Sequence, residues 1–255
     1  MATALITGAT AGIGAAYAKH LAKDGYDLVL VARDKKRLGS VAKSLSKEFG
    51  VKTEILVADL SKSAQLAKVE KRLANKLKPI EVLVNNAGFG INKSFLESAR
   101  DVEQELLDVL VTAPMRLTHS VLPIMKERNL GTIVNVSSVA SWIAGGTYSA
   151  AKSYLTVFTE SLHTELRGTK VNISALCPGF TRTEFHQRGR MKMTGLPNFM
   201  WLSAEKVVAH SWKAAKSGKA IVVPGWQYLI LSSISRFGPR PMVRRIGMNV
   251  RKKQR

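Results

Sequence analysis

The sequence predicts an α/β protein: a single doubly wound domain built on a seven-stranded parallel sheet. Two observations predict this class. Short apolar segments of strand character alternate with segments of helical period along nearly the whole chain, an order typical of a parallel sheet covered by helices on both faces. The chain has 255 residues, no internal repeat and no long linker, so it suffices for one domain with a large buried core.

The first strand and helix frame a glycine-containing loop. Residues 3–7 (TALIT) are a short apolar run that leads into this loop. Residues 13–24 repeat apolar side chains with the period of a helix, and the helix is expected to end at Gly25. Residues 27–32 (DLVLVA) are almost continuously apolar, as expected of a strand buried on both faces.

The alternation continues through the middle of the chain. A basic amphipathic helix is predicted over 35–48, where Gly50 stops it, and a third strand over 52–58. A helix over 62–77 and a fourth strand over 80–84 follow.

A long helical region at 98–128 precedes the fifth strand, 132–136. The remaining order is helix, strand, helix, strand, predicted over 147–167, 170–175, 203–217 and 220–223. We therefore assign residues 1–225 to the folded domain and 226–255 to a basic, partly apolar C-terminal extension.

Composition argues against several function classes. The chain has one cysteine, Cys177, so an internal disulfide and a cysteine-rich metal site are excluded, and the five histidines lack metal-ligand spacing. We expect no metal. No secretory signal is visible, and the most apolar stretch, 220–234, is broken by proline and glycine and is too short to span a bilayer. A cytoplasmic protein, with an option of peripheral membrane contact, is expected.

The charge is strongly basic and unevenly placed. Formal net charge is +21, and residues 206–255 carry 12 Lys or Arg and no Asp or Glu. Such a segment attracts polyanions: anionic lipid, nucleic acid or phosphorylated substrates. No recognition motif or interleaving of aromatic and basic residues supports specific nucleic-acid binding.

The loop from Thr7 to Gly14 has the spacing Gly-x-x-x-Gly-x-Gly. Glycines let a backbone approach a pyrophosphate, and the helix that follows offers free N–H groups and a positive dipole end. The spacing differs from the common Gly-x-Gly-x-x-Gly fingerprint, but its place between the first strand and the first helix supports dinucleotide binding.

Tyr148 and Lys152 stand four residues apart, on one face of a predicted helix. A cationic neighbour favours the phenolate, so the pair predicts a tyrosine with a lowered pKa that exchanges a proton with an alcohol or carbonyl oxygen. Taken alone the pair is also compatible with a solvated helix face.

Taken together and in order, these motifs carry a resemblance. The loop at Thr7–Gly14, the sequence Asn85-Asn86-Ala87-Gly88 after the fourth strand, Ser138 after the fifth, the Tyr148/Lys152 pair and Pro178-Gly179 after the sixth resemble the short-chain dehydrogenases/reductases. The resemblance runs from about residue 3 to 224. It implies a Rossmann fold, a nicotinamide cofactor, a small carbonyl or alcohol substrate, and a homodimer or homotetramer.

The resemblance also implies residue roles. Tyr148 is the general acid/base, Lys152 lowers its pKa and holds the nicotinamide ribose, and Ser138 binds the substrate oxygen, with Ser137 as the weaker alternative. The residues implied to contact the cofactor are Gly8, Thr10, Gly12, Ile13, Gly14, Arg33, Asp59, Leu60, Asn86, Ala87, Gly88, Tyr148, Lys152, Pro178, Gly179, Thr181 and Thr183.

The choice between NADP and NAD depends on the end of the second strand. The acid that would bind the ribose hydroxyls of NAD has a neutral counterpart here, Ala32, and Arg33 follows it. A guanidinium at this place pairs with a 2′-phosphate, whereas Asp34 lies one or two places late for the ribose. We therefore expect NADP(H), with NAD the less favoured alternative and a solvated turn the non-functional interpretation of Arg33.

Two positions depart from the family pattern. The family commonly has an asparagine where Leu110 stands, and that amide is thought to hold a water in a proton relay from the lysine. Leucine has no donor or acceptor. Either another group holds the water or turnover is reduced. Ser138 and Tyr148 are also ten apart, about three fewer than is common, which predicts a shorter loop over 139–146.

Residues 226–246 mix large apolar side chains with arginines. Three interpretations remain open: an anchor on an anionic membrane surface, a cover over a lipid-like substrate, or subunit packing with a solvated basic tail. The segment at 180–202 predicts a partly apolar lid.

The sequence thus predicts an NADP(H)-dependent oxidoreductase that interconverts a carbonyl and a secondary alcohol, with an apolar substrate such as a 3-ketoacyl compound, a steroid or a similar ketone. The alternative is a nucleotide-sensing or scaffold protein of the same fold with little turnover, which Leu110 favours. A nucleic-acid-binding protein is a second rival, suggested by charge alone.

Overall fold

The computed structural model describes residues 2–189, 196–245 and 247, and the parts of the predicted lid (190–195) and basic tail (246 and 248–255) outside these ranges are not discussed. Its centre is a seven-stranded, all-parallel sheet in the order β3-β2-β1-β4-β5-β6-β7, which confirms the predicted fold class. The strands are β1 Thr3–Thr7, β2 Asp27–Ala32, β3 Thr53–Val57, β4 Val82–Asn85, β5 Gly131–Val136, β6 Val171–Leu176 and β7 Ile221–Val222.

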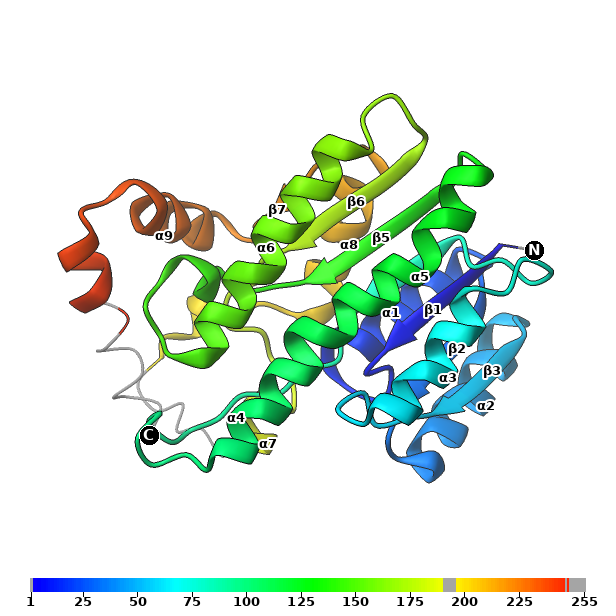
Figure 1. The fold of residues 1–255 in the computed structure, drawn as a ribbon, viewed down its shortest axis with the longest axis horizontal. Coiled ribbons are helices and arrows are strands. Elements are labelled where there is room, and N and C mark those ends of the chain that lie inside the picture. Colours follow the sequence, from blue (N-terminus) through cyan, green and yellow to red (C-terminus); the bar gives the residue numbers. More distant parts are fainter. Residues whose placement is uncertain (1, 190–195, 246, 248–255) are drawn as a thin grey trace.

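Helices cover the sheet from both sides (Figure 1). Those that follow the strands along the chain are α1 Gly12–Lys23, α2 Lys35–Phe49, α3 Ser63–Leu73, α4 Arg100–Leu107, α5 Ala113–Glu127, α6 Thr147–Glu165, α7 Phe185–Arg188, α8 Ala204–Lys216 and α9 Trp226–Phe237. One face packs against α1, α2 and α8, the other against α3, α5 and α6.

Alternation along the strands produces these two cores. In β1, Ala4 and Ile6 join the cluster under α1 and α8, while Leu5 joins the cluster under α3 and α5. Trp212 of α8 is among the largest fully buried side chains, and its indole donates to Asp24 Oδ2 at 3.0 Å. Burial of apolar side chains on both faces accounts for the near-continuous apolar strands of the sequence.

The edge of the sheet departs from that pattern. In β3, Ile55 and Val57 are about 40% exposed. This strand lies at the end of the strand order, so it has one strand neighbour, β2, and less cover. Its apolar residues therefore reflect β-propensity as much as burial.

The helical region predicted at 98–128 is divided. Between α4 and α5 lies a five-residue π-helix, Asp108–Thr112, followed by Pro114 in the first turn of α5. Proline has no N–H to donate, and π-turns inside helices widen the local backbone. Leu110 is in this π-helix and faces the interior, where it is 1% exposed.

The C-terminal extension contains structure that the sequence analysis did not assign. Residues 226–237 form α9, which lies at one end of the molecule beyond β7 (Figure 1). Gly225 enters the helix with φ +88°, a conformation that glycine adopts without strain.

Candidate active site

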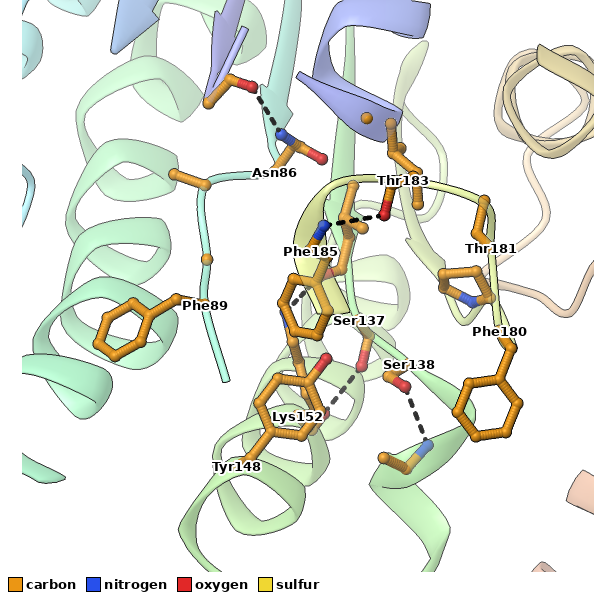
Figure 2. A pocket seen from close by; sticks show the side chains of 18 of the residues that line it. Asn86, Phe89, Ser137, Ser138, Tyr148, Lys152, Phe180, Thr181, Thr183 and Phe185 are labelled. Carbon is orange, nitrogen blue, oxygen red and sulfur yellow. Dashed lines mark hydrogen bonds between the residues drawn. The ribbon is translucent and has the colours of Figure 1, made fainter. Parts of the chain in front are cut away.

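A large cavity opens where the order of the strands reverses between β1 and β4 (Figure 2). Its volume is 890 Å³, within the size range of sites that enclose small molecules. In open parallel sheets ligands bind at the carboxyl ends of the strands, at such a reversal. Every residue predicted for the site lines this cavity except Gly14.

The loop between β1 and α1 forms one end of the cavity. Gly8 and Gly12 have φ angles of +67° and +54°, which favour glycine. Ala11, at the N-terminus of α1, offers no side-chain cap, and the first turn holds no acid. The N–H groups of that turn therefore stay available to an anion beside Thr10 and Ile13.

Gly14 has a packing role rather than a place on the cavity wall. A Cβ there would lie 2.3 Å from the carbonyl oxygen of Gly8 and 2.3 Å from Asn86 Nδ2. The glycine thus lets α1 pack directly against the loop. The predicted contact of Gly14 with a cofactor remains a prediction.

The end of β2 forms a second, more polar wall. Arg33 lines the cavity with a side chain that is 66% exposed, and its Nη1 lies 3.6 Å from Glu105 Oε1. Asp34 accepts from Arg37 N at 2.9 Å and so caps α2. Asp59 accepts from the backbone N–H and the hydroxyl of Ser61, while Leu60 is buried beside it.

Asn86, Ala87 and Gly88 hold the first loop in place. Asn86 Nδ2 donates to the carbonyl oxygen of Thr7 at 2.8 Å (Figure 2), and the N–H groups of Asn86 and Ala87 both donate to Thr7 Oγ1. Gly88 leaves room for Leu110, because a Cβ there would lie 2.7 Å from Leu110 Cδ2.

Ser138, Tyr148 and Lys152 meet at the far end of the cavity (Figure 2). The Ser138 side chain acts on the Tyr148 hydroxyl so as to lower its pKa. Lys152 Nζ lies 5.7 Å from the centre of the Tyr148 ring and donates to the Val136 carbonyl oxygen at 2.6 Å. The three residues come from the end of β5 and the first two turns of α6, so the parallel sheet brings them together.

Ser137 faces away from this group. It is buried, its hydroxyl donates to the Lys152 carbonyl oxygen at 3.0 Å, and it lies 2.7 Å from Thr156 Oγ1. Ser138 instead precedes a short 3-10 helix, Val139–Trp142, and its hydroxyl accepts from Ala140 N. This helix fills the short interval between Ser138 and Tyr148.

Burial, rather than the lysine charge, dominates the titration of the pair. Desolvation raises the pKa of Tyr148 to about 12, and the Ser138 side chain opposes that rise. Desolvation also lowers the pKa of Lys152 to about 8. The direction of the Tyr148 shift is thus opposite to that predicted from a cationic neighbour alone.

The segment after β6 closes the cavity from above. Pro178, Gly179, Thr181 and Thr183 line it, and Thr183 Oγ1 accepts from Phe185 N (Figure 2). A Cβ on Gly179 would lie 2.1 Å from Tyr228 Cζ, so this loop packs directly against α9.

Three functional-site residues escaped the sequence analysis. The ring of Phe185 lies 6.0 Å from that of Tyr148, Glu184 forms a bidentate ion pair with Arg37, and Tyr228 lines the cavity from α9. Arg37 and Glu184 are 147 residues apart in the sequence, so no local spacing predicts their contact.

Within residues 2–189, 196–245 and 247, no three His, Cys, Asp or Glu side chains gather as metal ligands. Over the same ranges, no helix has the length and apolar character needed to cross a bilayer.

The fold and this site define a class of protein. Residues 2–193 match the family model described as short chain dehydrogenase, and the chain belongs to that family of oxidoreductases. Ketoacyl reductase HetN of Nostoc sp. (strain PCC 7120) is 34% identical over 92% of this chain and 82% of its own length.

Two hydroxysteroid dehydrogenase-like relatives are longer than this chain. Hydroxysteroid dehydrogenase-like protein 1 of Gallus gallus is 33% identical over 82% of this chain and 63% of its own length. A Homo sapiens protein named Inactive hydroxysteroid dehydrogenase-like protein 1 is also 33% identical, over 81% of this chain and 63% of its own. The chain therefore spans less than two thirds of both relatives.

Solved structures share the fold closely. A short-chain dehydrogenase from Sphingobium yanoikuyae in complex with NADPH is 34% identical, with a TM-score of 0.84 over 91% of this chain and 93% of that one. A short-chain dehydrogenase/reductase from Burkholderia phymatum in complex with NAD is 25% identical, with a TM-score of 0.80 over 91% and 92%.

The residues present fit a nicotinamide dinucleotide. The cavity joins the uncapped N-terminus of α1 to the Ser138–Tyr148–Lys152 group, and Gly8 and Gly12 present bare backbone at its loop end. The loop residues suit the pyrophosphate, Arg33 and Asp59 the adenosine end, and Lys152 the ribose near Tyr148.

Proposed function

We propose that this protein is an NADP(H)-dependent oxidoreductase that interconverts a carbonyl and a secondary alcohol, with Tyr148 as the general acid/base. The observation that carries the proposal is the contact of Tyr148 with Ser138 and Lys152 at one end of a cavity whose other end suits a dinucleotide phosphate.

The chemistry follows from the protonation of these groups. A phenol with a pKa of about 12 is protonated near neutral pH and donates to a carbonyl oxygen as that oxygen gains negative charge. Ser138 adds a second donor, and together they stabilise the developing alkoxide. Lys152, charged below its pKa of about 8, favours the phenolate that Tyr148 becomes. When bound, the nicotinamide supplies or accepts the hydride.

The test is oxidation of NADPH against a panel of ketones and aldehydes. Tyr148→Phe should lower kcat by about 10²- to 10⁴-fold, the usual contribution of a general acid. Tyr154→Phe is the matched control, because Tyr154 is on the same helix but stacks on Phe158 and is 39% exposed. Equal turnover of Tyr148→Phe and wild type on an active substrate would refute the role.

The alternative of a low-turnover sensor or scaffold has two supports: Leu110, and the relative named as inactive. The two functions separate in one assay. A sensor binds NADPH with an ordinary affinity but fails to consume it with every carbonyl on the panel, whereas the proposed enzyme turns over at least one of them.

We infer NADP(H) rather than NAD(H) from the end of β2. Arg33 and Asp34 both line the cavity, but Asp34 Oδ1 is engaged as the cap of α2. Arg33→Ala should raise the KM for NADPH about tenfold or more and leave that for NADH nearly unchanged, since a charged hydrogen bond contributes about 1.5–3 kcal/mol. Lys36→Ala, on the exposed side of α2, is the control. An unchanged ratio of the two constants would overturn the preference.

An apolar substrate is proposed from the wall around Tyr148. Phe89, Ile143, Phe185 and Leu231 line the cavity there. Such a wall suits 3-ketoacyl compounds, steroids or similar bulky ketones, and the names of the relatives point the same way. The panel should rank these above short, polar ketones in kcat/KM, and the opposite order would exclude this class.

The partners proposed for the protein include an anionic lipid surface. The outward face of α9 carries an exposed apolar stripe made of Trp226, Leu229, Ile230, Ile234 and Phe237, and Arg236, Arg240 and Arg244 beside it are exposed. Such a combination suits a bilayer interface. A homodimer or homotetramer, and a cytoplasmic location, remain expectations for light scattering and fractionation to test.

A further inference from the structure

An acceptor atom near the active site lacks a partner. Asn85, the last residue of β4, is 5% exposed, and its Oδ1 has no hydrogen bond to any described residue. A buried acceptor left unpaired is costly, so such atoms usually contact an ordered water.

The neighbours of Asn85 fix which way its amide points. Asn85 Nδ2 donates to Asn135 Oδ1 at 2.8 Å and to Thr118 Oγ1 at 3.1 Å. Asn135 Nδ2 donates to Thr159 Oγ1, whose own hydrogen goes to the Leu155 carbonyl oxygen. Turning the Asn85 amide over would place two oxygens against each other at Asn135. The donor-to-acceptor direction of this series of hydrogen bonds therefore leaves Asn85 Oδ1 without a partner among the described residues.

A small void has both Asn85 and Lys152 in its lining, among mostly apolar side chains. Its volume is 10 Å³, about the minimum that admits one water, and its lining includes Asn85, Lys152, Thr7 and Leu110. The Thr7 hydroxyl is already engaged with Val84, Asn86 and Ala87. The Lys152 ammonium has three hydrogens, and Val136 accepts one of them.

We propose that one buried water occupies this void, accepting a hydrogen bond from Lys152 Nζ and donating one to Asn85 Oδ1. Asn85 is then a positioning residue. Through the water, Asn85 gives Lys152 a hydrogen-bond acceptor. Leu110 lines the same void and cannot supply one. The proposal rests on the proposed function only in taking Lys152 as the lysine of the active site.

The consequence for Lys152 concerns its charge. Burial disfavours the ammonium, and a water that accepts from it offsets part of that penalty. The titratable groups facing Lys152 are Tyr148 on its own helix and Cys177 after β6; the latter favours the charged lysine. The water thus keeps more of Lys152 charged at neutral pH.

Two measurements test the proposal without any substrate. A high-resolution crystal structure of the wild-type protein should show a water about 3 Å from both Asn85 Oδ1 and Lys152 Nζ. A dry void, or an Asn85 side chain turned over, would overturn the proposal. The second measurement is the titration of the Lys152 Cε signal in ¹³C-lysine-labelled protein, assigned by its absence from Lys152→Arg.

Variants separate the water from the packing of Asn85. Asn85→Leu should lower the pKa of Lys152 by about one unit, and adding Leu110→Asn should restore it by returning an amide to the void. Thr118→Val removes a partner of Asn85 Nδ2 but keeps Oδ1, so it should cost stability and leave the Lys152 titration unchanged. A Lys152 titration that shifts equally in Asn85→Leu and Thr118→Val would overturn the role. Because the titration needs no turnover, failure of the proposed reaction would not affect its outcome.

Discussion

Tyr148 shows how a charge and its burial compete at one residue. The spacing of Tyr148 and Lys152 correctly places them together, but it contains no information about their exposure. Both groups are removed from water, and burial stabilises the neutral form of each relative to the charged form. The tyrosine pKa therefore rises and the lysine pKa falls. The neutral phenol is the form that donates a proton to a carbonyl oxygen in the proposed reaction.

The lowered pKa of Lys152 predicts a pH dependence of stability. Between its folded value of about 8 and its ordinary value of 10.5, the unfolded chain holds a proton that the folded protein has lost. The contribution of Lys152 to the free energy of unfolding therefore rises with pH across this window. Across the whole window, the free energy of unfolding gains on the order of 3 kcal/mol from the deprotonation of Lys152.

Comparison with Lys152→Met isolates this effect. Cys177 and Tyr148 have raised pKa values and act in the opposite direction above their ordinary values of 9.0 and 10.0, but they are present in both proteins, and Lys152 is among the smaller causes of the Cys177 shift. The wild-type value minus the variant value, from urea unfolding, should increase from pH 8 upward. A difference that stays flat or falls between pH 8 and 10 would contradict the buried ammonium.

The site residues that could be predicted from the sequence are those whose positions depend on local backbone geometry. Glycines at Gly8 and Gly12 are recognisable because a tight loop needs them, and Ser138, Tyr148 and Lys152 because strand and helix spacing brings them to one edge. Phe185, Glu184 and Tyr228 were not predictable, since their contacts join segments far apart in the sequence, up to 147 residues for Arg37 and Glu184. Asp34 illustrates a second limit: the sequence weighed it for a ribose, and the structure uses it as a helix cap.

At the scale of elements, helix and strand order could be predicted from apolar period, whereas irregular turns could not. The π-helix at Asp108–Thr112 interrupts a segment whose apolar pattern predicts one continuous helix. Its single extra residue per turn leaves almost no trace in the periodicity. The helical state of 226–237 was hidden because its outward side is also apolar, which obscures the usual division into two faces.

Helix α9 packs against the loop that contains Gly179, and this contact predicts the effect of adding one methyl group at that residue. A Cβ at Gly179 would overlap the Tyr228 ring, whose hydroxyl is held by the Met200 carbonyl oxygen at 2.6 Å. Gly179→Ala should displace the ring and cost about 1–3 kcal/mol of stability, as overpacking usually does. Urea unfolding followed by circular dichroism measures the loss, and limited proteolysis should show earlier cleavage near α9.

The matched control is Gly39→Ala. Gly39 lies inside α2, and a Cβ there meets nothing within 4 Å. Alanine is the better helix former, so this variant should gain about 0.5–1 kcal/mol. If Gly179→Ala unfolds at the same urea concentration as wild type, α9 does not depend on its contact with the loop.

At the scale of the whole molecule, the asymmetry of charge and the position of α9 act together. The net charge is +21, and in the described part of the chain after Glu205 the charged side chains are all basic. Tyr228, Leu231, Ser232 and Ile234 of α9 line the cavity. Ile234 also belongs to the exposed stripe, so the stripe borders the cavity. A membrane bound at the stripe would therefore lie next to the cavity, which suits entry of an apolar substrate.

This arrangement predicts binding to vesicles that contain phosphatidylglycerol, weaker binding to pure phosphatidylcholine, and release by salt. Replacing both Trp226 and Phe237 by Gln should weaken vesicle binding about tenfold or more, since each aromatic side chain contributes apolar area at the interface. Leu77→Gln with Leu96→Gln is the control, because these leucines are 92% and 95% exposed, more than Trp226 and Phe237 at 71% and 82%, and belong to segments other than α9. If the stripe variant sediments with vesicles as wild type does, the lipid surface is excluded. If it instead halves the mass measured by light scattering while wild type ignores vesicles, a second copy of this chain covers the stripe.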